Sequence, residues 1–187
     1  MLSNLKAFFI FASMEKVAFI INPFSAKRNY QPFLNELHAK VKDPLYYISE
    51  SILGTDDFIQ NHFAEVDIFV AIGGDGTIST VAKNLINTEK ILAIFPAGSG
   101  NGFSNETNFS KNLDELIEKL RAKKSRKIDT FTINGRLSIN VSGTGFDGKV
   151  VKEFEKTTRG FKNYIKVSLK TFFRYKPKKV KFLDEKY

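Results

Sequence analysis

The pattern of apolar and polar positions divides the first 126 residues into alternating strands and helices. Short runs rich in apolar residues are typical of strands buried in a parallel sheet, and four of them lie at residues 16–21, 45–49, 68–72 and 91–95. The intervening stretches repeat their apolar residues at helical spacing, which predicts helices over residues 30–41, 56–64, 78–87 and 111–124. Thr55 is the expected N-cap of the second helix. This alternation predicts an α/β fold with a parallel sheet.

The pattern changes after Arg126. Two short stretches, 128–133 and 136–141, flank Asn134-Gly135, which predicts a β-hairpin with a type I′ turn. We therefore predict an α/β domain over residues 14–126 and the start of a β-rich second domain over residues 127–187. The second part continues with a glycine-rich stretch at 143–148, a helix at 159–175 and a strand from residue 180, and we expect it to be incomplete.

Polar or glycine-rich turns follow three of the predicted strands, at residues 22–29, 73–77 and 97–102. Because ligands bind beyond the carboxyl ends of parallel strands, these turns are expected to converge on one edge of the sheet. The middle turn, Gly-Gly-Asp-Gly-Thr, runs into a helix, where free backbone N–H groups bind phosphate and glycines allow close approach. Its acid, Asp75, would repel a phosphate unless a metal ion or a proton lay between them. The turn thus predicts a nucleotide-phosphate site with an acid of its own, while a simple helix N-cap role for Asp75 is the alternative.

The composition limits the chemistry that is available. The chain has no cysteine and two histidines, His38 and His62, so a disulfide scaffold and a thiolate metal site are excluded and histidine-based catalysis is disfavoured. The candidate chemistry therefore rests on carboxylates, hydroxyls, backbone N–H groups and a bound cation, and no metal-binding residues are assigned.

The net charge of +9 is concentrated near the carboxyl terminus. Residues 1–148 contain 16 basic and 16 acidic residues, whereas residues 149–187 contain 13 basic and 4 acidic residues. Within helix 159–175 the cations recur at every fourth position beside an apolar side; they are Lys162, Lys166, Lys170 and Arg174. Such a basic amphipathic segment, residues 159–176, is expected to contact an anionic membrane surface, with a merely solvated face as the alternative. No nucleic-acid partner is expected, because no recognised binding motif or aromatic platform accompanies the charge.

The apolar run at residues 5–12 is far shorter than the ~20 residues that span a bilayer, and no cleavage-site pattern follows it. We therefore predict a cytoplasmic protein that can lie peripherally at a membrane. An unfinished sheet edge also favours pairing between copies, so a homo-oligomer is among the expected assemblies.

The motifs together resemble those of the diacylglycerol-kinase-like lipid kinases, which include bacterial diacylglycerol and lipid kinases and the sphingosine kinases. Five marks occur in order: residues 22–25 (Asn-Pro-Phe-Ser), 73–77 (Gly-Gly-Asp-Gly-Thr), 96–101 (Pro-Ala-Gly-Ser-Gly-Asn), Ile128-Asp129 with Asn134-Gly135, and 145–147 (Gly-Phe-Asp). The Gly-Gly-Asp motif alone also occurs in nicotinamide dinucleotide kinases and phosphofructokinases. The five motifs in this order are what distinguish the lipid kinases.

The resemblance implies a Rossmann-like α/β domain followed by a β-sandwich domain, with ATP and Mg²⁺ in the cleft between them. The residues that would line the nucleotide are Asn22, Pro23, Ser25, Ser51, Gly73, Gly74, Gly76, Thr77, Gly98, Ser99, Gly100 and Asn101. Asp75 would act in the phosphoryl-transfer centre, near Mg²⁺ or the acceptor hydroxyl. Asp147 would contact the lipid head group.

The implied function is a lipid kinase that moves the γ-phosphoryl of ATP to the hydroxyl of a diacylglycerol-like or sphingosine-like lipid. The chain departs from the family at Ala26, where glycine is usual, and at Ser79-Thr80, where Asn-Glu is usual. The Mg²⁺-site and base residues of longer members also lie in a part of the second domain that is absent here. A nucleotide-binding but catalytically incomplete regulatory module is therefore one alternative. A nicotinamide dinucleotide kinase is the other, although residues 22–25 and 99–101 fit the lipid branch better.

Overall fold

The fold is described from a computed structural model of the 187-residue chain. The structure describes residues 16–25, 29–98, 101–139, 142–143, 145–158 and 160–177. The chain divides into two compact units, Met1–Asn140 and Val141–Tyr187.

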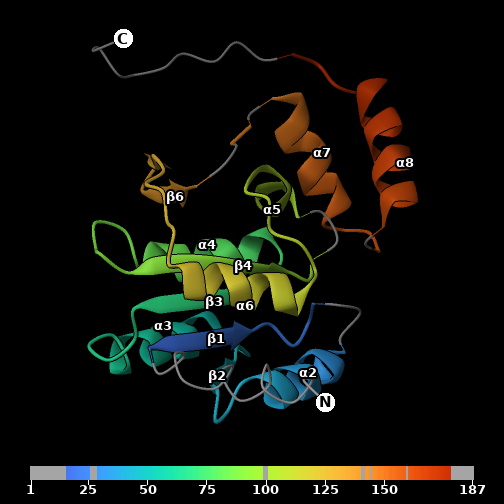
Figure 1. Cartoon of the computed structure of the whole chain (residues 1–187). Helices are drawn as coiled ribbons and strands as arrows, with labels where there is room; N and C mark the ends of the chain where they lie inside the picture. The colour runs from blue at the N-terminus through green and yellow to red at the C-terminus, as the bar shows by residue number, and fades with distance from the viewer. Residues whose placement is uncertain are drawn as a thin grey trace. The chain divides into compact units, whose positions relative to one another are not determined.

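The first unit is built on a four-stranded parallel sheet (Figure 1). Its strands are β1 (Val17–Ile21), β2 (Leu45–Ile48), β3 (Ile68–Gly73) and β4 (Ile91–Pro96), in the order β2-β1-β3-β4. The prediction of an α/β fold with a parallel sheet is confirmed. The chain leaves β1 towards β2 and returns to the other side of β1 as β3, so the topological switch point lies between β1 and β3.

Helices cover both faces of this sheet, which explains why its central strands are apolar throughout. The helices are α2 (Gln31–Lys40), α3 (Ile52–Asn61), α4 (Asp75–Lys83) and α6 (Leu113–Ala122). Alternate strand residues face opposite sides: Phe19 and Val70 pack with α2 and α6, whereas Phe69 packs with α3 and α4.

Two of the predicted helix starts were wrong. Helix α3 is capped by Ser51, whose hydroxyl accepts a hydrogen bond from Gly54 N at 3.0 Å. Thr55, the predicted cap, is buried inside the helix, where its hydroxyl donates to Ser51 O at 2.8 Å. Helix α4 begins at Asp75 and ends at Lys83, earlier than the predicted 78–87, and Asn87 beyond it has the left-handed φ of 58°.

A short helix that the sequence pattern did not predict follows β4. Helix α5 (Gly102–Glu106) occupies the end of the third glycine-rich turn, and Asn101 precedes it with a left-handed φ of 54°. Five residues are too few to show the helical spacing of apolar residues, so the sequence pattern could not predict this helix.

The predicted hairpin is confirmed in a shorter form. Strands β5 (Phe131–Ile133) and β6 (Arg136–Ser138) pair antiparallel. Asn134 and Gly135 have φ values of 51° and 74°, as a type I′ turn requires. The hairpin falls within the first compact unit, and the domain limits 14–126 and 127–187 stay a prediction.

The second unit is helical in its described part. Helix α7 (Phe146–Phe154), which the sequence did not predict, begins inside the glycine-rich stretch 143–148. Helix α8 (Phe161–Phe172) confirms the predicted helix in shorter form. Phe154 and Tyr164 pack edge to face across the two helices, with ring centroids 5.5 Å apart. The strand predicted from residue 180 lies outside the described residues.

Candidate functional site

The turns after β1 and β3 are joined by hydrogen bonds at the switch point of the sheet. Asn22 Nδ2 donates to Thr77 Oγ1 at 2.8 Å, and Asn22 N donates to Ile72 O at 3.0 Å. Thr77 is buried, with 7% of its surface exposed, and its hydroxyl also fills the space beside Gly73. The structure therefore brings the first two predicted turns together, with Asn22 and Thr77 as the direct link.

The turns after β3 and β4 meet backbone to backbone. A Cβ atom at Gly98 would lie 2.5 Å from the Cα of Gly74, a separation that real side chains do not show. Ala97 N and Gly98 N both donate to Gly73 O, at 2.9 Å and 3.2 Å. Glycine at 98 is thus required by close packing, and the contact joins the third predicted turn to the second.

The amino-terminal end of α4 lies within this group of turns. Gly74 is the N-cap residue and supplies no side-chain cap to the first N–H groups of the helix. A Cβ atom at Gly76 would meet no other atom within 4 Å, so the space beside this residue is open. Free N–H groups at a helix start beside open space form a site that an anion can enter.

Asp75 is the first residue of α4, and its exposed carboxylate connects α4 to α5. Its Oδ1 accepts a hydrogen bond from Phe103 N at 3.1 Å, and its Oδ2 accepts one from Gly102 N at 3.3 Å. The alternative reading of Asp75 as the N-cap of its own helix was wrong, because Gly74 holds that position. The carboxylate instead caps the first turn of α5.

Asn101 supports the third turn from inside. Its Nδ2 donates to Gly98 O at 2.8 Å, while its Oδ1 is buried and has no hydrogen-bond partner among the described residues. Ser104 Oγ is buried without a partner in the same part of the structure. Since buried polar atoms are normally hydrogen-bonded, these two atoms mark the turn as a place that can accept a further polar group. Ser99 and Gly100 lie outside the described residues.

The remaining predicted site residues are less closely joined to these turns. Ser25 N donates to Asn22 O at 3.2 Å within the first turn, which also contains Pro23. The side chain of Ser51 caps α3 after β2. Asp147 belongs to α7 in the second unit.

The N–H groups of Gly102 and Phe103 are the part of the site that the sequence did not reveal. They hold the carboxylate of Asp75 although they lie 27 and 28 positions away from it. No local pattern links residues at that separation, so this contact depends on the fold.

The donor set suits a metal ion that arrives with a nucleotide. Among the described residues no three His, Cys, Asp or Glu side chains gather into a metal cluster. Magnesium is commonly held by one or two carboxylates together with substrate phosphates and water. Asp75 at the start of α4 could provide one such carboxylate, with the remaining ligands supplied by phosphates and water.

Comparison with known proteins shows which family the chain resembles. The family model described as "Diacylglycerol kinase catalytic domain" matches residues 16–133. A diacylglycerol kinase of Bacillus subtilis is 26% identical over 144 residues, covering 71% of this chain and 46% of that protein. A provisionally named lipid kinase of Streptococcus pneumoniae is 30% identical over 125 residues, covering 62% of this chain and 42% of that protein.

Solved structures show the same likeness. The crystal structure of a diacylglycerol kinase from Bacillus anthracis superposes with a TM-score of 0.55 at 25% identity, covering 66% of this chain and 45% of that one. The chain thus spans less than half the length of each of these three proteins.

Proposed function

Because the chain belongs to the family of diacylglycerol kinase catalytic domains, we propose that its first unit binds ATP with Mg²⁺ at the three converging turns. The protein then transfers the γ-phosphoryl group to the hydroxyl of a diacylglycerol-like or sphingosine-like lipid. Phosphoryl transfer relies on positioning and charge neutralisation more than on covalent chemistry, which suits a site of backbone N–H groups and one acid.

The observation that carries this proposal is the meeting of the turns at the switch point. The Asn22–Thr77 hydrogen bond and the close approach of Gly74 and Gly98 place the ends of β1, β3 and β4 beside the start of α4. Ligands of open α/β sheets bind at such points. The phosphates would lie against the first N–H groups of α4, in the open space at Gly76.

The carboxylate of Asp75 has acceptor capacity to spare for a catalytic role. It accepts two hydrogen bonds from backbone N–H groups of α5, whereas an ionised carboxylate can accept about four. Bound Mg²⁺ would neutralise the charge of the phosphates during transfer. Asp75 would either hold that ion or accept the proton of the lipid hydroxyl, while Asn22 and Asn101 would keep the flanking turns in place.

A nucleotide-binding module without transfer activity of its own is the second candidate. Two observations favour this candidate. The Asp75 carboxylate already accepts two hydrogen bonds from α5. Residues 73–77 and 96–102 contain no second acid that could bind Mg²⁺ or accept a proton.

Thermal unfolding of the full chain with and without Mg²⁺–ATP tests the nucleotide site. A ligand at ~100 times its Kd should stabilise the protein by about 2.7 kcal/mol. Radiolabelled ATP with diacylglycerol or sphingosine in mixed micelles then tests transfer. We expect Asp75→Asn to abolish transfer, while Asp57→Asn, an equal change of charge at an exposed position of α3, should not.

Each outcome separates the candidates. Stabilisation by Mg²⁺–ATP without transfer would favour the binding module. Full transfer by Asp75→Asn would remove Asp75 from the mechanism, and absence of any ATP-dependent shift would contradict the nucleotide site in this chain.

The proposal includes a peripheral contact with an anionic membrane through α8. The side of this helix that faces solvent is strongly apolar: Leu169, Phe172 and Phe173 are 57%, 66% and 83% exposed. The cations at 162, 166, 170 and 174 occupy the adjoining side and are exposed as well. An apolar stripe bordered by lysines suits the interface of an anionic bilayer. In the described part of the chain no helix has the length and apolar character needed to cross a membrane.

A further inference from the structure

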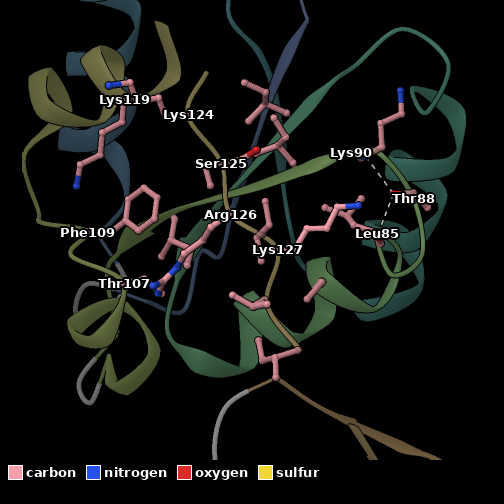
Figure 2. Close-up of a pocket in the computed structure, with 18 of the residues that line it drawn as sticks. Leu85, Thr88, Lys90, Thr107, Phe109, Lys119, Lys124, Ser125, Arg126 and Lys127 are labelled. Carbon is pink, nitrogen blue, oxygen red and sulfur yellow. Dashed lines mark hydrogen bonds between the residues drawn. The ribbon is translucent and has the colours of Figure 1, made fainter. Parts of the chain in front are cut away.

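A hollow of about 980 Å³ lies beside the first residues of β4, in the first unit (Figure 2). It is lined by Ile91–Ile94, by the end of α4, by residues 107–109 and by the segment 123–128 that follows α6. None of the described residues in the turns at 22–25, 73–77 and 97–98 lines it. Apart from Phe103, whose N–H donates to Asp75, no residue that lines the hollow belongs to the candidate nucleotide site.

The floor of the hollow is apolar and comes from several elements of the fold. It consists of Leu85, Leu92, Ile94, Phe103, Phe109 and Ile139. All six side chains belong to, or pack against, the core on the α3–α4 face of the sheet, so the floor is held in place. Apolar floors of this volume are typical of pockets that bind small ligands.

The rim of the hollow is strongly basic. Six cations line it, against the single carboxylate of Glu89: Lys90, Lys119, Lys123, Lys124, Arg126 and Lys127. In Figure 2, Arg126 and Lys127 extend to either side of the segment that carries them.

Two of these cations are already engaged, and four are not. Lys90 lies 3.9 Å from a carboxylate oxygen of Asp67, and the ammonium of Lys119 lies 4.7 Å from the ring centre of Phe109. Within the described chain no carboxylate lies within 4.0 Å of the cationic atoms of Lys123, Lys124, Arg126 or Lys127. Four unpaired cations within five residues repel one another, and an anion at the rim would relieve that repulsion.

We propose that this hollow binds a single-chain amphiphile with an anionic head, either a carboxylate or a phosphomonoester. The head would lie among the cations of the 123–127 segment, and the chain would cover the apolar floor. An inorganic anion would contact only the basic rim, and a neutral amphiphile would contact only the apolar floor. A molecule with an anionic head and an apolar chain contacts both. The proposal does not depend on the proposed kinase activity.

Calorimetric titration of the full chain with dodecyl phosphate, below its critical micelle concentration, tests the site. We expect saturable binding of one molecule per chain. The double variant Arg126→Gln/Lys127→Gln should weaken the affinity by about tenfold, because two of the positive charges that attract the anionic head are lost. The charge-matched variant Lys42→Gln/Lys111→Gln, at exposed positions outside the hollow, should bind as the original chain does.

Further arms separate the head from the chain of the ligand. Inorganic phosphate and dodecyl maltoside should each bind far more weakly than dodecyl phosphate. Ile128→Asn, at a 44% exposed position of the lining, should weaken binding, whereas Leu53→Asn, 76% exposed and outside the lining, should not.

Three results would overturn the proposal. They are equal loss of affinity in the two charge-matched variants, binding of inorganic phosphate as tight as that of dodecyl phosphate, and binding to anionic vesicles with none to the monomeric amphiphile.

Discussion

Gly98 and Gly76 belong to the same candidate site but have different surroundings. At Gly98 the protein has no room for a side chain, because a Cβ atom would lie 2.5 Å from the Cα of Gly74. At Gly76 the protein itself leaves the space open. Neither residue has a left-handed φ, so backbone strain does not explain either choice.

Replacing each glycine by alanine should therefore have opposite effects on stability. Gly98→Ala should cost about 1–3 kcal/mol, because two backbones must move apart. Gly76→Ala lies in the first turn of α4 and should stabilise the fold by up to ~1 kcal/mol, since alanine favours the helix. Urea unfolding of both variants measures these changes.

The same pair tests the phosphate-binding role. If phosphate occupies the open space, Gly76→Ala should weaken the stabilisation by Mg²⁺–ATP although the fold itself is no less stable. Unchanged ATP binding by Gly76→Ala would show that the nucleotide lies elsewhere.

Asp75 illustrates how far residue-level prediction could go. The acid was singled out from its glycine neighbours, but its partners Gly102 and Phe103 belong to a helix formed after another strand. Its place in the chain was evident from the sequence, and its hydrogen bonds were not.

At the scale of elements, α3 depends on a choice between two hydroxyl residues four positions apart. Both Ser51 and Thr55 have the side chain of an N-cap, and Thr55 was the one predicted. The structure selects Ser51 because its backbone is extended before the helix, with φ −143° and ψ 157°, while Thr55 is fully buried. Thr55 is thus a buried residue within the helix, and Ser51 holds the capping position.

Removing the cap should destabilise the protein without altering its core. Ser51→Ala should cost about 1 kcal/mol, because the N–H of Gly54 loses its acceptor. Ser51→Asp should restore most of the stability, since aspartate caps equally well. Equal losses for alanine and aspartate in thermal unfolding would show that the hydroxyl acts by other means.

Helix α8 allows a prediction about membranes that does not involve catalysis. The full chain should sediment with vesicles that contain phosphatidylglycerol, and far less with phosphatidylcholine alone. Lys166→Gln/Lys170→Gln should weaken this binding by about 2 kcal/mol, as each basic residue near an anionic surface contributes about 1 kcal/mol. Raised salt should have a similar effect.

The apolar stripe of α8 needs a test of its own. Phe172→Ser/Phe173→Ser should reduce vesicle binding while the charge stays the same. Lys42→Gln/Lys111→Gln is the charge-matched control for the lysine variant. Loss of binding in that control would indicate attraction by net charge alone and would contradict a docking role for α8.

At the scale of the whole molecule, both hydrophobic core clusters of the described residues lie in the first unit. Both core clusters, one on each face of the sheet, are built only from residues between Val17 and Ile139. The second unit contributes Val150 and Thr171 to the buried residues of the described chain. A domain with its own core is expected to fold alone.

A chain that ends at Asn140 should therefore unfold cooperatively. Urea denaturation followed by circular dichroism should give a single transition, and Mg²⁺–ATP should still raise the midpoint. A broad, non-cooperative transition would mean that the first unit needs the residues that follow it. The full-length chain is the matched control.

The sequence by itself determined the parallel α/β fold, the strand positions and the turns that form the candidate site. These features follow from short-range patterns: apolar runs for buried strands, helical spacing between them, and glycine where a turn is tight. Asn134-Gly135 likewise marked its hairpin, because few residue pairs adopt two left-handed conformations in succession.

The tertiary structure alone decided which groups of the site touch and where the hollow lies. The Asn22–Thr77 bond, the capping of α5 by Asp75 and the packing of Gly74 on Gly98 join residues that are distant in the chain. The cations at 123–127 form a basic run in the sequence, and only the fold places the apolar side chains of β4 and Phe109 beside them. The physical reason is the same in each case. Local preferences depend on neighbouring residues, whereas a site depends on distances that exist only once the sheet has assembled.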